Sequence, residues 1–491
     1  MSLTTPYLPA LRLLTGGRRA TPKASKLAHY LKDLRKSTTS QLESLFEDIL
    51  PPNFFDLVSA RLGKPTRNRK FPARVTFWAG IEQALRTKRD GGSLREALSQ
   101  INGCRDEQGR GTISGNTGGL CKARQRFSHA YLEEAQERTV RYLEGAAERL
   151  DSLHGRPVKV VDATHVILSD TVENQRYFPQ SENAKPGCGF PVARIMGLFS
   201  AQSGALLGHG VVGRDVAEIM AFEGEIVPLL QSDDILVADR QYSVYWIFGR
   251  MLEQGVDVVI RKNGSVKTLK TIRCLRARRD RLVLWSKPPR QPESLTEEEF
   301  ASLPPTLTLR QVTVTIRNRE GKKVRLQLLT TLLDPLAYPS ESIARLYQLR
   351  WSIEVTFRDV KSTLGMERIK AESYDVVTKI IAFYLIAHNL IRILMIKAAR
   401  VHHLPLEAIS FTGTLDSAKS YASHLYHNRM KPERIRQLYY ALLEIIARHQ
   451  IPRRPGRHEP RLVKHRRQKY SWLTSPRKRY YHPRKINVIC A

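Results

Sequence analysis

Three acidic residues, Asp162, Asp239 and Glu354, are candidates for a catalytic site. Asp162 lies within an apolar run, VKVVDATHVIL, and Asp239 ends another, DILVAD. Both runs predict buried strands, in which an unpaired carboxylate is costly because it loses its hydration. Ligands of α/β sheets gather at the carboxyl ends of strands. We therefore expect Asp162 and Asp239 on neighbouring strands, meeting Glu354 from a helix.

Three converging carboxylates repel one another unless cations lie between them. Carboxylate oxygens are ligands that Mg²⁺ and Mn²⁺ prefer, and two such ions about 4 Å apart can assist the displacement of a phosphodiester. The pattern predicts a site for two Mg²⁺ (or Mn²⁺) ions at Asp162, Asp239 and Glu354, which are also the predicted catalytic residues. The alternative for each acid taken singly is a helix cap or an ion pair.

The helix predicted around Glu354 begins with Ser340 as N-cap after Pro339 and stops at Gly365. On a helical wheel it presents two stripes. The first is apolar and predicts packing on a core: Leu346, Leu349, Ile353, Phe357, Val360 and Leu364. The second lies on the shoulder of the helix: Tyr347, Arg350, Glu354 and Lys361. The alternative is a solvated face with i,i+4 ion pairs.

Composition indicates the partner and the compartment. The net charge of +33 favours a polyanion as partner, most simply nucleic acid. The five cysteines are scattered and form no CxxC motif, which suggests a reducing compartment. The opening residues lack the long apolar core of a signal peptide, and the apolar run 380–396 includes His388, Asn389 and Arg392, so it predicts a buried helix. We expect a cytoplasmic protein that binds double-stranded DNA and no membrane.

The order of predicted elements is typical of an α/β fold with a mixed sheet, interrupted by a mainly β insertion and flanked by a helical N-terminal region and a basic helical C-terminal region. A helix is predicted over Val216 to Leu230. A short helix, a basic turn and a long helix are predicted over CKARQRFSHAYLEEAQERTVRYLEGAAERL, a pattern that resembles a DNA reader or an ordinary bundle. The predicted divisions are a basic segment (1–70), a helical DNA-binding region (71–152), the first part of the core (153–263), the β insertion (264–339), the second part of the core (340–400) and the C-terminal region (401–491), which includes a basic, aromatic tail.

These motifs together resemble a known family. The spacing Tyr347-x2-Arg350-x3-Glu354-x6-Lys361 is similar to the Tyr-Arg-Glu-Lys signature of the DDE transposases of bacterial insertion sequences, in the insertion-sequence-four family. Asp162 and Asp239 resemble the first two acids of that family's triad. The β segment between Asp239 and Glu354 resembles its insertion domain, and the resemblance covers residues from about 70 to 400.

The resemblance implies an RNase H-like core and cut-and-paste transposition, in which water releases a 3′-hydroxyl at each terminal inverted repeat and that hydroxyl is later joined to target DNA. It implies DNA contacts by Tyr347, Arg350 and Lys361. Arg240 is a further predicted DNA contact, and Trp285 is a candidate for stacking a flipped base, with a core role as the alternative. A homodimer is expected in the synaptic complex, because two ends must be held together.

Two other functions compete with the transposase. An RNase H-like nuclease or resolvase would cut DNA without strand transfer, and a non-catalytic remnant would only occupy the repeats. The large β insertion and the basic flanks favour the transposase over the nuclease. The presence of all three acids and Lys361 argues against a remnant.

Overall fold

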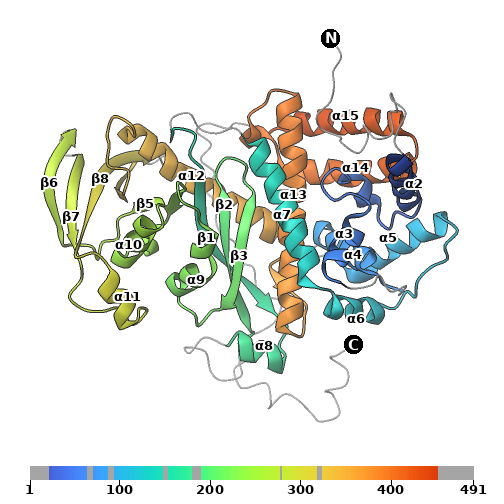
Figure 1. Ribbon diagram of the computed structural model, residues 1–491, viewed down its shortest axis with the longest axis horizontal. Helices are drawn as coiled ribbons and strands as arrows, with labels where there is room; N and C mark the ends of the chain where they lie inside the picture. The colour runs from blue at the N-terminus through green and yellow to red at the C-terminus, as the bar shows by residue number, and fades with distance from the viewer. Residues whose placement is uncertain are drawn as a thin grey trace, which may run out of the picture.

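The computed structural model describes residues 22–63, 70–86, 93–147, 153–179, 189–276, 279–317 and 323–451, and of residues 22–27, 276, 316–317 and 351–355 the backbone alone. The predicted basic tail therefore lies outside the described residues. Figure 1 shows a central sheet with a helical assembly on one side of it. The predicted α/β fold with a mixed sheet and helical ends is confirmed.

The sheet contains strands from the predicted core and from the insertion. Its strand order is β3-β2-β1-β4-β5-β9-β8-β7-β6, with β10 paired to β1. The bounds are β1 Val158–Leu168, β2 Val192–Ser200, β3 Leu206–Gly213, β4 Ile235–Ala238, β5 Asp257–Arg261, β6 Leu269–Arg276, β7 Asp280–Ser286, β8 Thr306–Arg317, β9 Lys323–Thr330 and β10 Arg368–Ile369. The strands β1, β4 and β5 are parallel, whereas β2 and β3 run antiparallel to their neighbours. This order and these directions agree with the RNase H-like core that the resemblance implies.

The insertion continues the same sheet. Strand β9 pairs antiparallel with β5, and β8, β7 and β6 follow outward. Its polar stretch forms the short helix α11, Glu297–Ser302, which begins with a capping box between Thr296 and Glu299. The chain thus leaves the core after β5 and returns beside the same strand, so the insertion is anchored to the strand next to β4.

Helices precede and follow the sheet. The N-terminal elements are α2 Pro22–Lys36, η1 Gln41–Leu45, α3 Phe54–Arg61, α4 Ala73–Leu85, α5 Leu94–Glu107, α6 Gly118–Arg126 and α7 His129–Ala146. The later ones are α12 Ser340–Arg358, the π-helical turn η5 Asp359–Thr363, α13 Tyr374–Val401, η6 Leu406–Ala408, α14 Phe411–His427 and α15 Pro432–Arg448. Helices α7 and α13 run side by side between the sheet and the helices α2 to α6, α14 and α15 (Figure 1). The buried ion pair between Lys397 of α13 and Asp48 ties the N-terminal region to the core.

Helix α13 is the apolar run predicted to be buried. Its length and composition would suffice to cross a membrane, but 89% of its most apolar window is buried inside the protein. Its polar residues are paired there: Asn389 binds both backbone groups of Leu206, and the Arg392 guanidinium donates to the Ser203 carbonyl. These contacts indicate a core helix.

Shorter helices connect the strands: α8 Val172–Tyr177, α9 Glu218–Glu225, η3 Val227–Leu229, η4 Arg240–Tyr242 and α10 Tyr245–Glu253. The prediction of one helix over Val216 to Leu230 is wrong. The helix stops at Glu225 and is followed by a 3-10 turn that contains Pro228. Proline lacks the N–H that a continuing helix requires, which explains the break.

Candidate active site

The register of β1 and β4 brings Asp162 and Asp239 together. These parallel strands pair Val158 with Ile235 and Val160 with Val237. Two residues beyond that last pair, Asp162 of β1 lies level with Asp239, the residue that directly follows β4. Because neighbouring strands are about 4.8 Å apart, the two carboxylates stand side by side at the carboxyl end of β4. This is the juxtaposition expected from the sequence.

Both acids point to the face of the sheet that α12 covers. Val158 and Val160 of β1, with Ile235 and Val237 of β4, belong to the core formed with α12 and α13. The alternate residues, among them Val161, Leu236 and Ala238, belong to the core formed with α9 and α10. Side chains alternate along a strand, so Asp162 and Asp239 face α12.

Local hydrogen bonds orient the two carboxylates. Asp162 Oδ1 accepts from the backbone N–H of Ala163 at 2.9 Å. Asp239 is the N-cap of the turn η4, and its Oδ1 accepts from the backbone N–H of Gln241 at 2.6 Å. Both residues are half-buried, at the boundary between the apolar sheet and solvent. They are therefore fixed in direction and accessible to a substrate.

Glu354 lies in α12, one turn beyond Arg350, and α12 packs against β1, β4 and β5. The side chain of Glu354 lies outside the described residues, so its convergence with Asp162 and Asp239 stays a prediction. The helix begins at Ser340 itself, and the Ser340 hydroxyl donates to Asp280 at 2.7 Å. The predicted N-cap is therefore wrong by one residue.

The end of α12 differs from the regular wheel. Residues Asp359–Thr363 form a π-helical turn, and the chain leaves it at Gly365, whose φ of 79° suits glycine. The wider turn rotates Lys361 away from the direction that a regular helix would give it. The apolar stripe is confirmed for its described members, since Phe357, Val360 and Leu364 are buried. Single π turns of this kind often accompany functional sites.

Tyr347 is buried rather than displayed on the shoulder of the helix, with 2% of its surface exposed. Burial raises the pKa of its phenol. The charges of Arg350 and Arg261, and a hydrogen bond from Arg350, lower that pKa in part. The Asp239 carboxylate is near enough to raise that pKa as well. The Arg350 guanidinium carbon lies 5.7 Å from the centre of the Tyr347 ring. Tyr347 thus lies within range of the charges of two arginines and of Asp239.

Lys361 belongs to a basic group around His165 of β1. Burial, followed by the positive charges of Arg194, Arg214 and Lys361, lowers the pKa of His165. Arg194 is the β2 partner of His165 in the sheet register. Cations from β2, from the residue after β3 and from the π turn therefore gather around His165, which lies three residues beyond Asp162 on β1 and points to the other face of the sheet.

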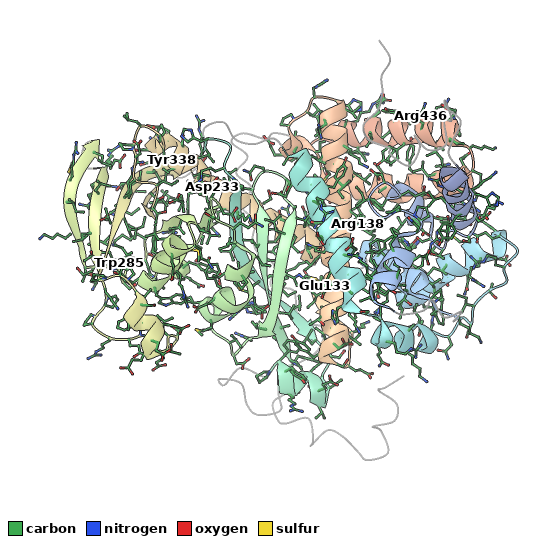
Figure 2. The ribbon with its side chains drawn as sticks, in the orientation of Figure 1. Glu133, Arg138, Asp233, Trp285, Tyr338 and Arg436 are labelled. Atoms are coloured by element: carbon green, nitrogen blue, oxygen red, sulfur yellow. The ribbon has the colours of Figure 1, made fainter. Side chains whose placement is uncertain are left out.

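Arg240 is exposed directly after Asp239, and its contact with DNA stays a prediction. Trp285 is different: it is 5% exposed and packs edge-on against Tyr245 and Phe248 at 5.4 and 5.7 Å. Figure 2 places it near α10 and α11, on the side of the insertion. Its predicted contact with DNA stays a prediction beside this packing role.

A cavity adjoins Trp285. It has a volume of about 260 Å³ and is lined mainly by aromatic and apolar side chains, including Tyr245, Trp246 and Phe300. Ser243, which also lines it, has a buried hydroxyl with no hydrogen-bond partner among the described residues. Ser243 is the residue directly after η4, so the lining of the cavity begins one short turn after Asp239 in the chain.

The described side chains supply part of a metal site. Within them, no group of three or more His, Cys, Asp and Glu residues is close enough to hold a metal ion. Asp162 and Asp239 supply two carboxylates on one face, and the third predicted ligand, Glu354, lies in the helix that covers that face. Such all-oxygen donors fit Mg²⁺ or Mn²⁺.

Three residues near this edge of the sheet were not predicted from the sequence: Arg261, Tyr242 and Glu218. Arg261 lies at the carboxyl end of β5, in the same way that Asp239 lies at the carboxyl end of β4. Ligands gather at the carboxyl ends of strands, so this rule could have identified Arg261 from the sequence. Tyr242 and Glu218 are joined by a hydrogen bond of 3.0 Å between segments 24 residues apart. No local signal identifies that pair.

Residues 153–390, which include all the predicted catalytic residues, match the family described as "Transposase DDE domain". This part of the chain is therefore a DDE transposase domain, and its mixed sheet agrees with that match.

A curated relative extends the likeness beyond the domain. The chain is a distant homologue of the transposase InsG of insertion sequence element IS4 from Escherichia coli (strain K12), with 24% identity over 450 residues, 88% of this chain and 93% of the relative. The cryo-EM structure of the piggyBac transposase synaptic complex with hairpin DNA is similar at a TM-score of 0.38, with 10% identity over 85% of this chain and 86% of that chain. A TM-score that low leaves residue correspondences undefined.

Proposed function

We propose that this chain is a DNA transposase that cuts DNA at the terminal inverted repeats of its element and joins the released 3′ ends to target DNA. The observation that supports it best is the pair Asp162 and Asp239, level on parallel strands β1 and β4 and facing the helix that contains Glu354. The family match to residues 153–390 and the net charge of +33 support it as well.

Asp162, Asp239 and Glu354 would hold the metal. Two Mg²⁺ (or Mn²⁺) ions bound there would activate the attacking oxygen and stabilise the leaving oxygen of the phosphodiester. The protein's remaining task is to position the DNA and offset its charge, because such a displacement needs little covalent chemistry from the protein.

Cations around the two acids would hold the DNA backbone. The charges of Arg350, Arg261 and Asp239 all act on Tyr347, and Arg240 is exposed directly after Asp239. Lys361 would hold the backbone beyond Asp162. Tyr347 is buried, so it would act on DNA indirectly, by orienting Arg350. The direct DNA contact predicted for Tyr347 would require α12 to move. Trp285 would meet a base only if the base entered the adjoining cavity.

The partners and the compartment are part of the proposal. We expect double-stranded DNA as substrate, a homodimer in the complex that holds two ends, and a bacterial cytoplasmic location on the nucleoid. The size of the complex with end DNA, measured by light scattering, tests the dimer.

The test of catalysis uses DNA that flanks the reading frame as substrate, with Mg²⁺ or Mn²⁺. We expect cleavage at the repeats that EDTA abolishes and that Asp239→Asn reduces by roughly 10²–10³-fold. Asp233→Asn is the matched control, since Asp233 is 70% exposed and pairs with Arg156 before β4. Cleavage by the Asp239→Asn protein at the wild-type rate would refute the assignment.

Strand transfer separates the transposase from the nuclease. Precut ends that carry a free 3′-hydroxyl should be joined to a plasmid by the wild-type protein. Cleavage without joining would favour the nuclease alternative, and binding without cleavage would favour the remnant.

A further inference from the structure

Tyr242 is a buried tyrosine three residues after Asp239, and the function proposed above gives it no role. It ends the turn η4, whose N-cap is Asp239, and 1% of its surface is exposed. Its ring packs edge-on against Phe222 of α9 at 5.1 Å. Its hydroxyl donates to Glu218 Oε1, in the first turn of α9, at 3.0 Å.

The hydroxyl of Tyr242 lies near the acids of the site. Burial raises the pKa of this phenol, and the negative charges of Glu218, Asp239 and Asp162 raise it further. The Tyr242 hydroxyl thus has the Glu218 carboxylate of α9 as its hydrogen-bond partner and lies within range of the charges of Asp239 and Asp162. Tyr242 therefore connects α9 to the turn that aims Asp239.

From these contacts we propose that Tyr242, anchored on Glu218, is a positioning residue for the metal site and fixes the direction of the Asp239 carboxylate relative to Asp162. The proposal rests on the function proposed above. A single 3-10 turn separates Tyr242 from Asp239, so a shift of the ring is transmitted directly to the acid. Metal ligands must be held within about 0.5 Å of their productive positions, and loss of a supporting hydrogen bond typically weakens metal binding by about 10–100-fold.

The experiment measures Mn²⁺ binding to the full chain without DNA, by electron paramagnetic resonance of free Mn²⁺. Tyr242→Phe removes the hydroxyl and keeps the ring against Phe222. We expect roughly 10-fold weaker Mn²⁺ binding and a melting temperature in EDTA close to that of the wild type. Wild-type affinity in Tyr242→Phe would overturn the proposal.

Tyr245→Phe is the matched control. Tyr245 is also buried, and its hydroxyl donates to the Pro304 carbonyl at 2.7 Å, toward the insertion. Its loss should leave Mn²⁺ affinity unchanged. Equal weakening in both variants would mean that any lost tyrosine hydroxyl disturbs the fold, which would contradict a specific role for Tyr242.

Glu218 distinguishes positioning from direct ligation. Glu218→Gln keeps an oxygen that accepts from Tyr242 and should bind Mn²⁺ nearly as the wild type does, whereas Glu218→Ala should weaken binding like Tyr242→Phe. Equal loss in both Glu218 variants would overturn the positioning role. Asp239→Asn separates the two proposals: if it binds Mn²⁺ as tightly as the wild type, the proposed metal site itself fails.

Discussion

A fully buried ion pair joins the insertion to the start of α12. Arg310 of β8 is 0% exposed, and its Nε and Nη2 donate to Asp280 of β7 at 2.8 and 2.6 Å. Its Nη1 donates to the carbonyls of Leu332, Asp334 and Tyr338. Ser340, the first residue of α12, donates to the same Asp280 carboxylate. Figure 2 shows Tyr338 beside this end of the helix.

Asp280→Asn should therefore destabilise the protein strongly. The substitution keeps the shape of the side chain but leaves the Arg310 charge buried without its counter-ion. Breaking a buried pair in this way costs about 3–5 kcal/mol, which corresponds to a fall in melting temperature of roughly 6–20 °C. Because the pair holds the first residue of α12, DNA cleavage should be lost at a correspondingly lower temperature.

The assay is thermal unfolding followed by circular dichroism. Glu433→Gln is the control, because it breaks an exposed ion pair with Arg436, whose side chains are 69% and 37% exposed. Such a pair contributes about 0–1 kcal/mol, so little change is expected. A melting temperature for Asp280→Asn within about 2 °C of the wild type would refute the reasoning.

Three further predictions follow from the same structure. Tyr347→Phe removes the hydroxyl that orients Arg350 and should weaken DNA binding by about 3–10-fold, from a hydrogen bond of roughly 0.5–1.5 kcal/mol; a filter-binding titration with unchanged affinity would contradict it. Burial lowers the pKa of His388 to about 3, so the folded state keeps this imidazole neutral. The unfolded chain protonates it below its ordinary pKa of about 6.5, so the stability that the neutral His388 contributes is present above pH 6.5 and is lost as the pH falls. Between pH 7.5 and pH 5 that loss is about 2 kcal/mol of unfolding free energy. The variant His388→Gln keeps an N–H donor for the Gly204 carbonyl, so urea titrations at the two pH values should show a smaller loss for it than for the wild type. Equal pH dependence in both proteins would refute this role of His388. Trp285→Ala should cost about 3–5 kcal/mol of stability because the ring packs on Tyr245 and Phe248, and an unchanged urea midpoint would exclude the packing role.

Much of the site could be predicted because its signals are local. An apolar run that contains or ends in an acid predicts a strand with a carboxylate, and the strands of Asp162 and Asp239 are neighbours as expected. The apolar stripe of α12 likewise predicts which face packs on the core.

The remaining features depend on tertiary contacts that have no local signal. A helical wheel assumes a regular turn, so it cannot show the π turn at Asp359–Thr363 that displaces Lys361. It also cannot show that the shoulder holding Tyr347 is covered. The pairs Arg310–Asp280 and Tyr242–Glu218 join segments 30 and 24 residues apart, and only the pairing of strands and the packing of α9 bring them together.

Metal-directed cleavage of the protein backbone would show whether Asp162, Asp239 and Glu354 hold divalent metal together. Fe²⁺ bound in place of Mg²⁺, with ascorbate and peroxide, cuts the chain next to its own ligands. If the three residues share the metal, we expect cuts near all of them, competed by Mg²⁺ and lost together in Asp239→Asn. Cuts near 162 and 239 without a cut near 354, or cuts that persist in Asp239→Asn, would contradict it.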